Sequence, residues 1–72
     1  MLYQTRDTAR QLLGEHYPAR MKELGAVLTR VAAGRKTSPF NAAQDVVRAA
    51  DLSGFEAIQL LAAAVELTEQ FD

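Results

Sequence analysis

The last 22 residues, DLSGFEAIQLLAAAVELTEQFD, constrain the fold of this chain more than any other segment. With about 100° between successive helical residues, most apolar side chains of this segment fall within roughly half of the helix circumference, with Leu61 near the middle of that arc. Ala62 and Ala63 fall on the more polar half. A helix that packs against a single neighbour needs an apolar arc of only about 100°. We therefore expect a central helix that contacts two or three other elements. Ala57 and Ala64, in the middle of the arc, would let a neighbouring helix approach closely.

Glycine and proline residues divide the rest of the chain into further helical segments. No stretch alternates β-branched or aromatic residues with polar ones, and Ala, Leu, Glu, Gln and Arg dominate, so no strand is predicted. We predict an all-α fold, a small antiparallel bundle of four helices at about residues 3–13, 18–33, 39–50 and 54–71. The 72 residues are predicted to form a single helical domain, since no change in composition marks a linker.

Several residues carry local signals for helix ends. Gly14 and Gly34 each follow a helical stretch and can adopt the left-handed conformation that ends a helix. Ser38 is expected to cap the third helix, since the proline that follows it suits the first helical position. Ser53 precedes Glu56 by three residues, which is the spacing of a capping box and the strongest local signal in the chain.

The charge is distributed unevenly, although the net charge is only −1. Residues 1–36 carry seven basic and three acidic residues, a net +4, whereas residues 37–72 carry one basic and six acidic residues, a net −5. Either the basic half is an electrostatic binding face, or the two halves attract each other where they pack. We prefer the second interpretation, because the halves of a small bundle are neighbours. The candidate basic face comprises Arg6, Arg10, Arg30, Arg35 and Lys36.

The sequence predicts no catalytic residue, no cofactor site and no metal site. It has no cysteine, and its one histidine, His16, has no second metal ligand at helical spacing. Lys36 and Thr37 lack the glycine spacing and the preceding strand of a phosphate-binding loop. A DNA-reading helix in the C-terminal segment would place Glu56 and Glu66 near phosphates, which is electrostatically unfavourable. We therefore expect a protein that is not an enzyme and needs no cofactor.

Small size and a broad apolar arc favour a protein-binding role. A 72-residue chain buries only roughly 60% of its unfolded surface, so association with another protein would stabilise it. We predict a non-catalytic interaction module, or a small regulator or inhibitor, that binds another protein and could form a homodimer. The candidate protein interface comprises Phe55, Gln59, Ala62 and Phe71. The alternative is a nucleic-acid-associated regulator that uses the basic face.

The first ten residues, MLYQTRDTAR, are polar and charged. They lack the apolar region of a signal peptide and the length of a membrane span. We expect a cytoplasmic protein that does not associate with a membrane.

Overall fold

The computed structural model describes the backbone of residues 2–70 and the side chains of residues 5–69. Regular structure in this part of the chain is helical throughout, which confirms the all-α class. The elements are α1 (Leu2–Leu13), the 3-10 helix η1 (Gly14–His16), α2 (Tyr17–Arg35), α3 (Pro39–Ala49) and α4 (Gly54–Gln70). Within residues 2–70, no helix is both long enough and apolar enough to cross a membrane.

The prediction of four separate helices is not confirmed, because α1, η1 and α2 follow one another without an intervening loop. Residues 2–70 therefore contain three uninterrupted helical stretches, 2–35, 39–49 and 54–70. The first stretch bends at Gly14, whose φ of +56° lies in the left-handed region that glycine adopts readily. Gly14 thus ends α1 as predicted, but a further helical turn leads directly into α2.

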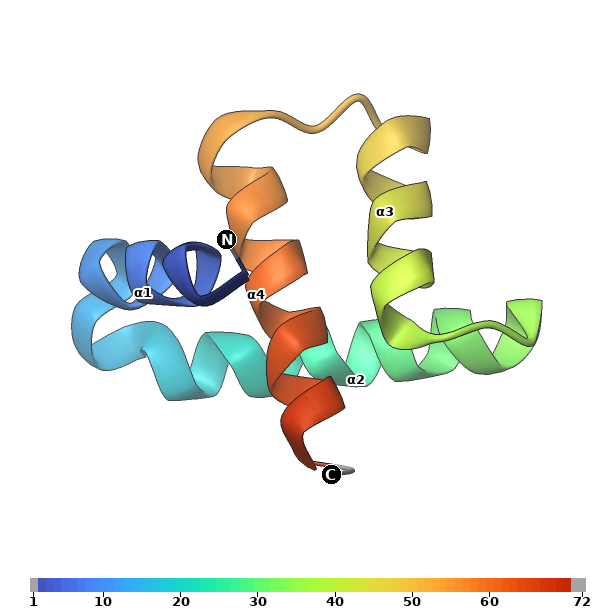
Figure 1. Cartoon of the computed structure of the whole chain (residues 1–72), viewed down its shortest axis with the longest axis horizontal. Coiled ribbons are helices and arrows are strands. Elements are labelled where there is room, and N and C mark those ends of the chain that lie inside the picture. Colours follow the sequence, from blue (N-terminus) through green and yellow to red (C-terminus); the bar gives the residue numbers. More distant parts are fainter. Residues whose placement is uncertain (1, 71–72) are drawn as a thin grey trace.

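The helices form two hairpins that cross steeply, rather than the predicted antiparallel bundle (Figure 1). α1 and α2 form one hairpin around η1, and α3 and α4 form the other. α2 crosses α4 and then reaches α3, while α1 crosses α4 from another side. α4 contacts α1, α2 and α3, so the prediction of a central C-terminal helix is confirmed.

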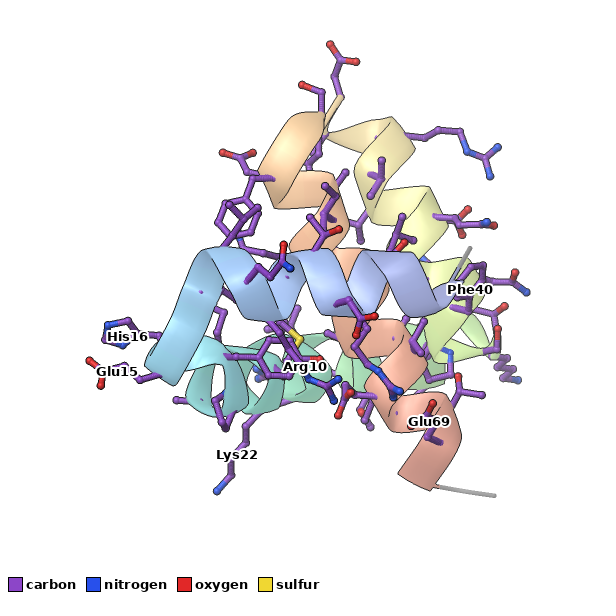
Figure 2. The ribbon with its side chains drawn as sticks, turned by 60° about the vertical axis from the view of Figure 1, so that its left-hand side comes forward. Arg10, Glu15, His16, Lys22, Phe40 and Glu69 are labelled. Carbon is purple, nitrogen blue, oxygen red and sulfur yellow. The ribbon has the colours of Figure 1, made fainter. Side chains whose placement is uncertain are left out.

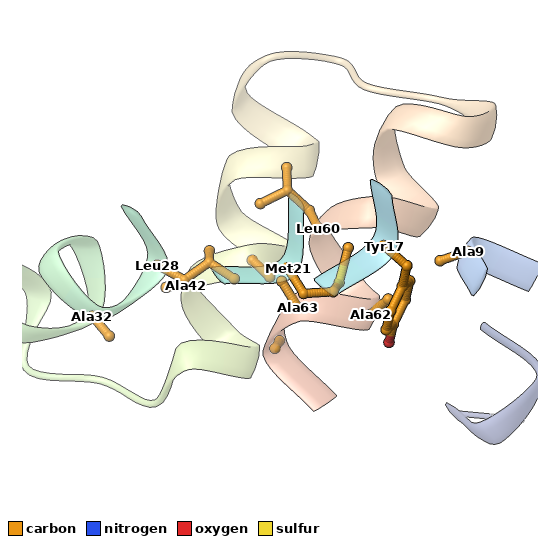
Figure 3. Packing of buried hydrophobic residues seen from close by; sticks show 11 residues of the cluster. Ala9, Tyr17, Met21, Leu28, Ala32, Ala42, Leu60, Ala62 and Ala63 are labelled. Atoms are coloured by element: carbon orange, nitrogen blue, oxygen red, sulfur yellow. The ribbon is translucent and has the colours of Figure 1, made fainter. Parts of the chain in front are cut away.

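Alanine supplies most of the core where the helices cross (Figure 3). Because these side chains are short, the backbones can approach closely at a crossing. At Gly25 of α2, an added Cβ would lie 3.5 Å from the side chain of Leu67 on α4. Leu28 of α2 is the largest side chain that is fully buried. The completely buried alanines are Ala9, Ala42, Ala43, Ala62, Ala63 and Ala64.

α4 is buried around more of its circumference than the apolar arc predicts. Ala62 and Ala63, expected on its more polar half, are fully buried. Leu61, expected in the middle of the arc, is only partly buried. The reason is that three helices cover different sides of α4, so small residues on any side can be enclosed.

α2 ends later than predicted, whereas α3 begins at the predicted cap. The predicted stop at Gly34 is wrong, because α2 continues to Arg35 and Lys36 takes the left-handed conformation with a φ of +55°. The Lys36 N–H donates to the carbonyl of Ala33, which satisfies one free acceptor at the helix end. The Ser38 hydroxyl oxygen accepts from the backbone N–H of Asn41 at 3.1 Å, which confirms the predicted cap of α3.

The start of α4 differs from the predicted capping box. Gly54 has a φ of +58°, so the chain turns sharply where α4 begins. Within the described side chains, no hydrogen bond joins Ser53 to Glu56. The left-handed turn thus replaces the expected side-chain cap.

Candidate functional site

A groove of about 750 Å³ lies between the first half of α2 and the second half of α4. Its apolar lining includes Met21 and Ala26 of α2 with Ala63 and Leu67 of α4. Gly25, where α2 lies close to Leu67, and the short side chain of Ala26 also line it. We call this feature the α2–α4 groove; its volume falls in the range of roughly 300–1,000 Å³ that is typical of ligand-binding clefts.

Charged and hydrogen-bonding side chains gather at one end of the groove. The Tyr17 hydroxyl donates to Oε1 of Glu66 at 3.1 Å. Arg6 Nη1 lies 3.2 Å from the same oxygen, and Arg10 Nη2 lies 3.6 Å from it. Arg6 also pairs with Glu69 of α4. The arginines of α1 therefore pair with the carboxylates of α4, and we call these five residues the polar cluster. Figure 2 labels two of them, Arg10 and Glu69.

Tyr17 links the polar cluster to the core. Its ring is buried, and the guanidinium carbon of Arg10 lies 5.1 Å from the ring centre, within range of a cation–π contact. Burial, together with the hydrogen bond and the charge of Glu66, raises the pKa of Tyr17 to about 12, and Arg10 and Arg6 lower it by less. The hydroxyl therefore stays protonated at neutral pH. This shift is in the wrong direction for a general acid or base, which needs a pKa near the working pH.

The candidate basic face is not brought together as one surface. Arg6 and Arg10 lie against Glu66, and Arg35, at the far end of α2, lies 3.2 Å from Asp45 of α3. Arg30, on the C-terminal half of α2, and Lys36, which follows the helix, are exposed. The pairs join the basic half of the sequence to the acidic half, which agrees with the interpretation preferred from the charge pattern.

Two residues of the candidate protein interface are buried, so the prediction is wrong at these positions. Gln59 is 8% exposed and Ala62 is 0% exposed, so neither presents a free surface. The Gln59 side-chain oxygen accepts from Nε of Arg20 at 2.8 Å, because α2 covers this side of α4. Phe55 is partly exposed, and Phe71 lies outside the described residues.

The α2–α4 groove was missed from the sequence, although a signal for it was present. Large apolar side chains recur along α2 at Met21, Leu24 and Leu28, and Gly25 and Ala26 lie between them. A glycine followed by alanine inside a long helix marks a place where another backbone approaches or a space is left. The sequence could not indicate that the C-terminal half of α4 would form the opposite wall.

His16, the one histidine of the chain, does not line the groove. His16 and Glu15 lie 3.9 Å apart and are exposed at the bend between α1 and α2 (Figure 2). In the part of the chain with described side chains, no three His, Asp or Glu residues are arranged to hold a metal ion. The function has to be inferred from these contacts, because no protein-family model, curated protein or solved structure matches the chain.

Proposed function

We propose that this chain is a non-catalytic protein-interaction module that binds a helical segment of another protein in the α2–α4 groove. The observation that supports the proposal is an apolar groove with cationic side chains at its edge. An amphipathic helix that lays its apolar face in such a groove is a common mode of peptide recognition. By holding such a segment, the module would act as a small regulator or inhibitor of the protein to which the segment belongs.

The shape of the groove suits a helical ligand. Along α2, Pro18, Lys22, Gly25 and Thr29 border the groove at helical spacing, so the groove follows the helix axis for about three turns. The floor at Met21 and Leu67 is apolar. A partner helix would place apolar side chains, three or four positions apart, over this floor.

The charge of the groove edge favours an acidic residue in the partner. Glu66 is already surrounded by Arg6, Arg10 and the Tyr17 hydroxyl. Lys22 is exposed, points into solvent in Figure 2 and forms no ion pair with any described side chain. The edge is therefore positive, and a carboxylate next to the apolar positions of the partner would complement it.

A matched pair of charge reversals tests the proposal. Tagged wild-type protein, Lys22→Glu and Lys36→Glu are used to capture proteins from an extract of the native host. Both lysines are exposed, but only Lys22 borders the groove. We expect a partner that is retained by wild type and by Lys36→Glu, and that binds Lys22→Glu roughly tenfold more weakly, because a like charge then faces its acidic residue.

The Met21 methyl group gives an independent readout. Met21 is one of two methionines in the chain and lies on the floor of the groove. Its NMR signal should shift when a synthetic peptide from the captured partner is added. Equal capture by wild type and Lys22→Glu, together with an unchanged Met21 signal, would contradict the proposal.

Self-association is the second part of the proposal. The core consists mainly of alanines, which bury little apolar area each, so the isolated chain gains limited stability from burial. A second copy that covers exposed apolar surface would add to it.

A nucleic-acid-associated regulator has less support. Of the candidate basic face, Arg6, Arg10 and Arg35 already lie next to carboxylates, so few cations are left to neutralise phosphates. A gel shift with mixed-sequence duplex at low salt tests this alternative. Retardation that disappears when Arg30 and Lys36 are changed to glutamine would favour it over the groove.

A further inference from the structure

The side of α2 that faces away from the core is poor in charge. Tyr17, Met21, Gly25, Leu28 and Ala32 are the buried residues of this helix. At about 100° per residue, the opposite side carries a single stripe of exposed residues. They are Ala19, Glu23, Ala26, Val27, Arg30, Ala33 and Gly34, and we call them the outer α2 face.

The outer α2 face contains five small or apolar residues and two opposite charges. Val27 is 43% exposed and is one of the few large apolar side chains of the described part of the chain that face solvent. Arg30 forms no ion pair with any described side chain. Glu23 accepts from Arg20 at 2.8 Å, but both side chains are substantially exposed, so this pair contributes little and can be exchanged.

The order of residues on the outer α2 face is self-complementary. Consider a second α2 that lies antiparallel to the first, with a two-fold axis between Ala26 and Val27. A residue before this axis then faces the residue of the partner that lies the same number of positions after it. Glu23 lies opposite the partner's Arg30, and Arg30 lies opposite the partner's Glu23. The same symmetry places Ala19 opposite the partner's Gly34. Both charges thus find an opposite charge, and small residues meet at the outer positions.

We infer that a second copy of this chain docks on the outer α2 face, with the two α2 helices antiparallel, and that this is the interface of a homodimer. The inference rests on the self-association in the proposed function and names its surface. A two-fold interface uses the same patch on both subunits. Glu23 and Arg30 meet this requirement, because each faces the other residue type on the second copy. Alanine and glycine let two helices approach to about 8 Å, near the lower end of the usual range.

The expected dimer is weak. The outer α2 face offers seven residues of each subunit, fewer than the roughly 20–30 residues on each side of a standard stable interface. Contacts of this size are typical of transient complexes. The association should therefore depend on protein concentration and, because charges contribute, on salt.

Charge-reversal variants, measured separately and then mixed, test the inference. Sedimentation of wild type, Glu23→Arg and Arg30→Glu is measured from about 10 μM to about 1 mM, a range that reports weak dissociation constants. We expect wild type to associate and each single variant to associate at least roughly tenfold more weakly, because like charges then face each other at two symmetric positions. Far-UV circular dichroism confirms that the variants stay helical, since both residues are exposed.

Mixing the two single variants gives the decisive measurement. One variant then carries arginine at positions 23 and 30 and the other carries glutamate at both, so every contact across the interface joins opposite charges. We expect association of the mixture to return to the wild-type level, as should the double variant Glu23→Arg/Arg30→Glu on its own.

Three outcomes would overturn the inference. The first is wild type that sediments as a 7.9 kDa monomer at the highest concentration. The second is a dimer that the single variants do not weaken, since another face would then be the interface. The third is a mixture that remains monomeric. The two surfaces share only Ala26, and peptide binding in the groove is read separately from the signal of Met21, which is buried on the inner side of α2.

Discussion

α2 and α4 are the two longest helices, at 19 and 17 residues, and their surroundings are opposite. α4 is enclosed by α1, α2 and α3, whereas α2 packs mainly against α4 and α3, contacts α1 less extensively, and leaves its outer side in solvent. Both helices are rich in alanine. Alanine is tolerated both inside a crossing and on a surface, so composition does not decide how far each helix is buried. The arrangement of the neighbouring helices around each one decides it.

The largest difference in stability is expected between substitutions on the two sides of α2. Leu28→Ala removes the largest fully buried side chain and should lower the free energy of unfolding by about 2–5 kcal/mol, much of the stability of a small domain. Val27→Ala removes an exposed side chain one position away and should change it by less than about 0.5 kcal/mol. Urea unfolding at low protein concentration measures both. Equal losses would mean that the rotation of α2 about its axis is wrong.

Replacing an alanine by leucine should have different effects on stability in α4 and in α2. Ala62→Leu adds volume at a fully buried position between helices and should cost about 1–3 kcal/mol through overpacking. Ala19→Leu makes the same change on the outer α2 face, where leucine has room and is a good helix former. We expect thermal unfolding to show a lower midpoint for the first variant and an unchanged one for the second. A tolerated leucine at position 62 would show that α4 is not enclosed on that side.

A substitution in the polar cluster should change the free energy of unfolding least, and this change should depend on pH. Tyr17→Phe removes the hydrogen bond to Glu66 and should cost about 0.5–1.5 kcal/mol. The native pKa of Tyr17 is raised to about 12, above the ordinary value of 10, so native protein keeps a proton that unfolded protein loses. The stabilisation is therefore complete below pH 10 and disappears as the pH rises to about 12.

Unfolding of wild type and Tyr17→Phe in parallel across this range checks the prediction. The difference between the two proteins should shrink as pH rises. A difference that stays constant from neutral pH to pH 12 would show that the Tyr17 hydroxyl is not held by the cluster.

Local features of the structure were predicted better than the site. The start of α3 at Ser38 follows from a cap that involves only neighbouring residues. The stop at Gly34 was wrong because the left-handed position falls two residues later, at Lys36, where the chain must turn towards α3. Gln59 was predicted to be exposed because it falls on the more polar half of the C-terminal helix, yet α2 covers that side and Arg20 donates to its side chain.

The sequence alone determined the helical class, the approximate helix ends and the central position of the C-terminal helix. These depend on periodicity, breakers and the width of an apolar arc, all of which are properties of neighbouring residues. Only the tertiary structure decided that the hairpins cross, that Gln59 and Ala62 are enclosed, and that a groove opens beside Gly25. An alanine surface has low relief and fits several crossing geometries, so the choice among them depends on contacts between residues far apart in the chain.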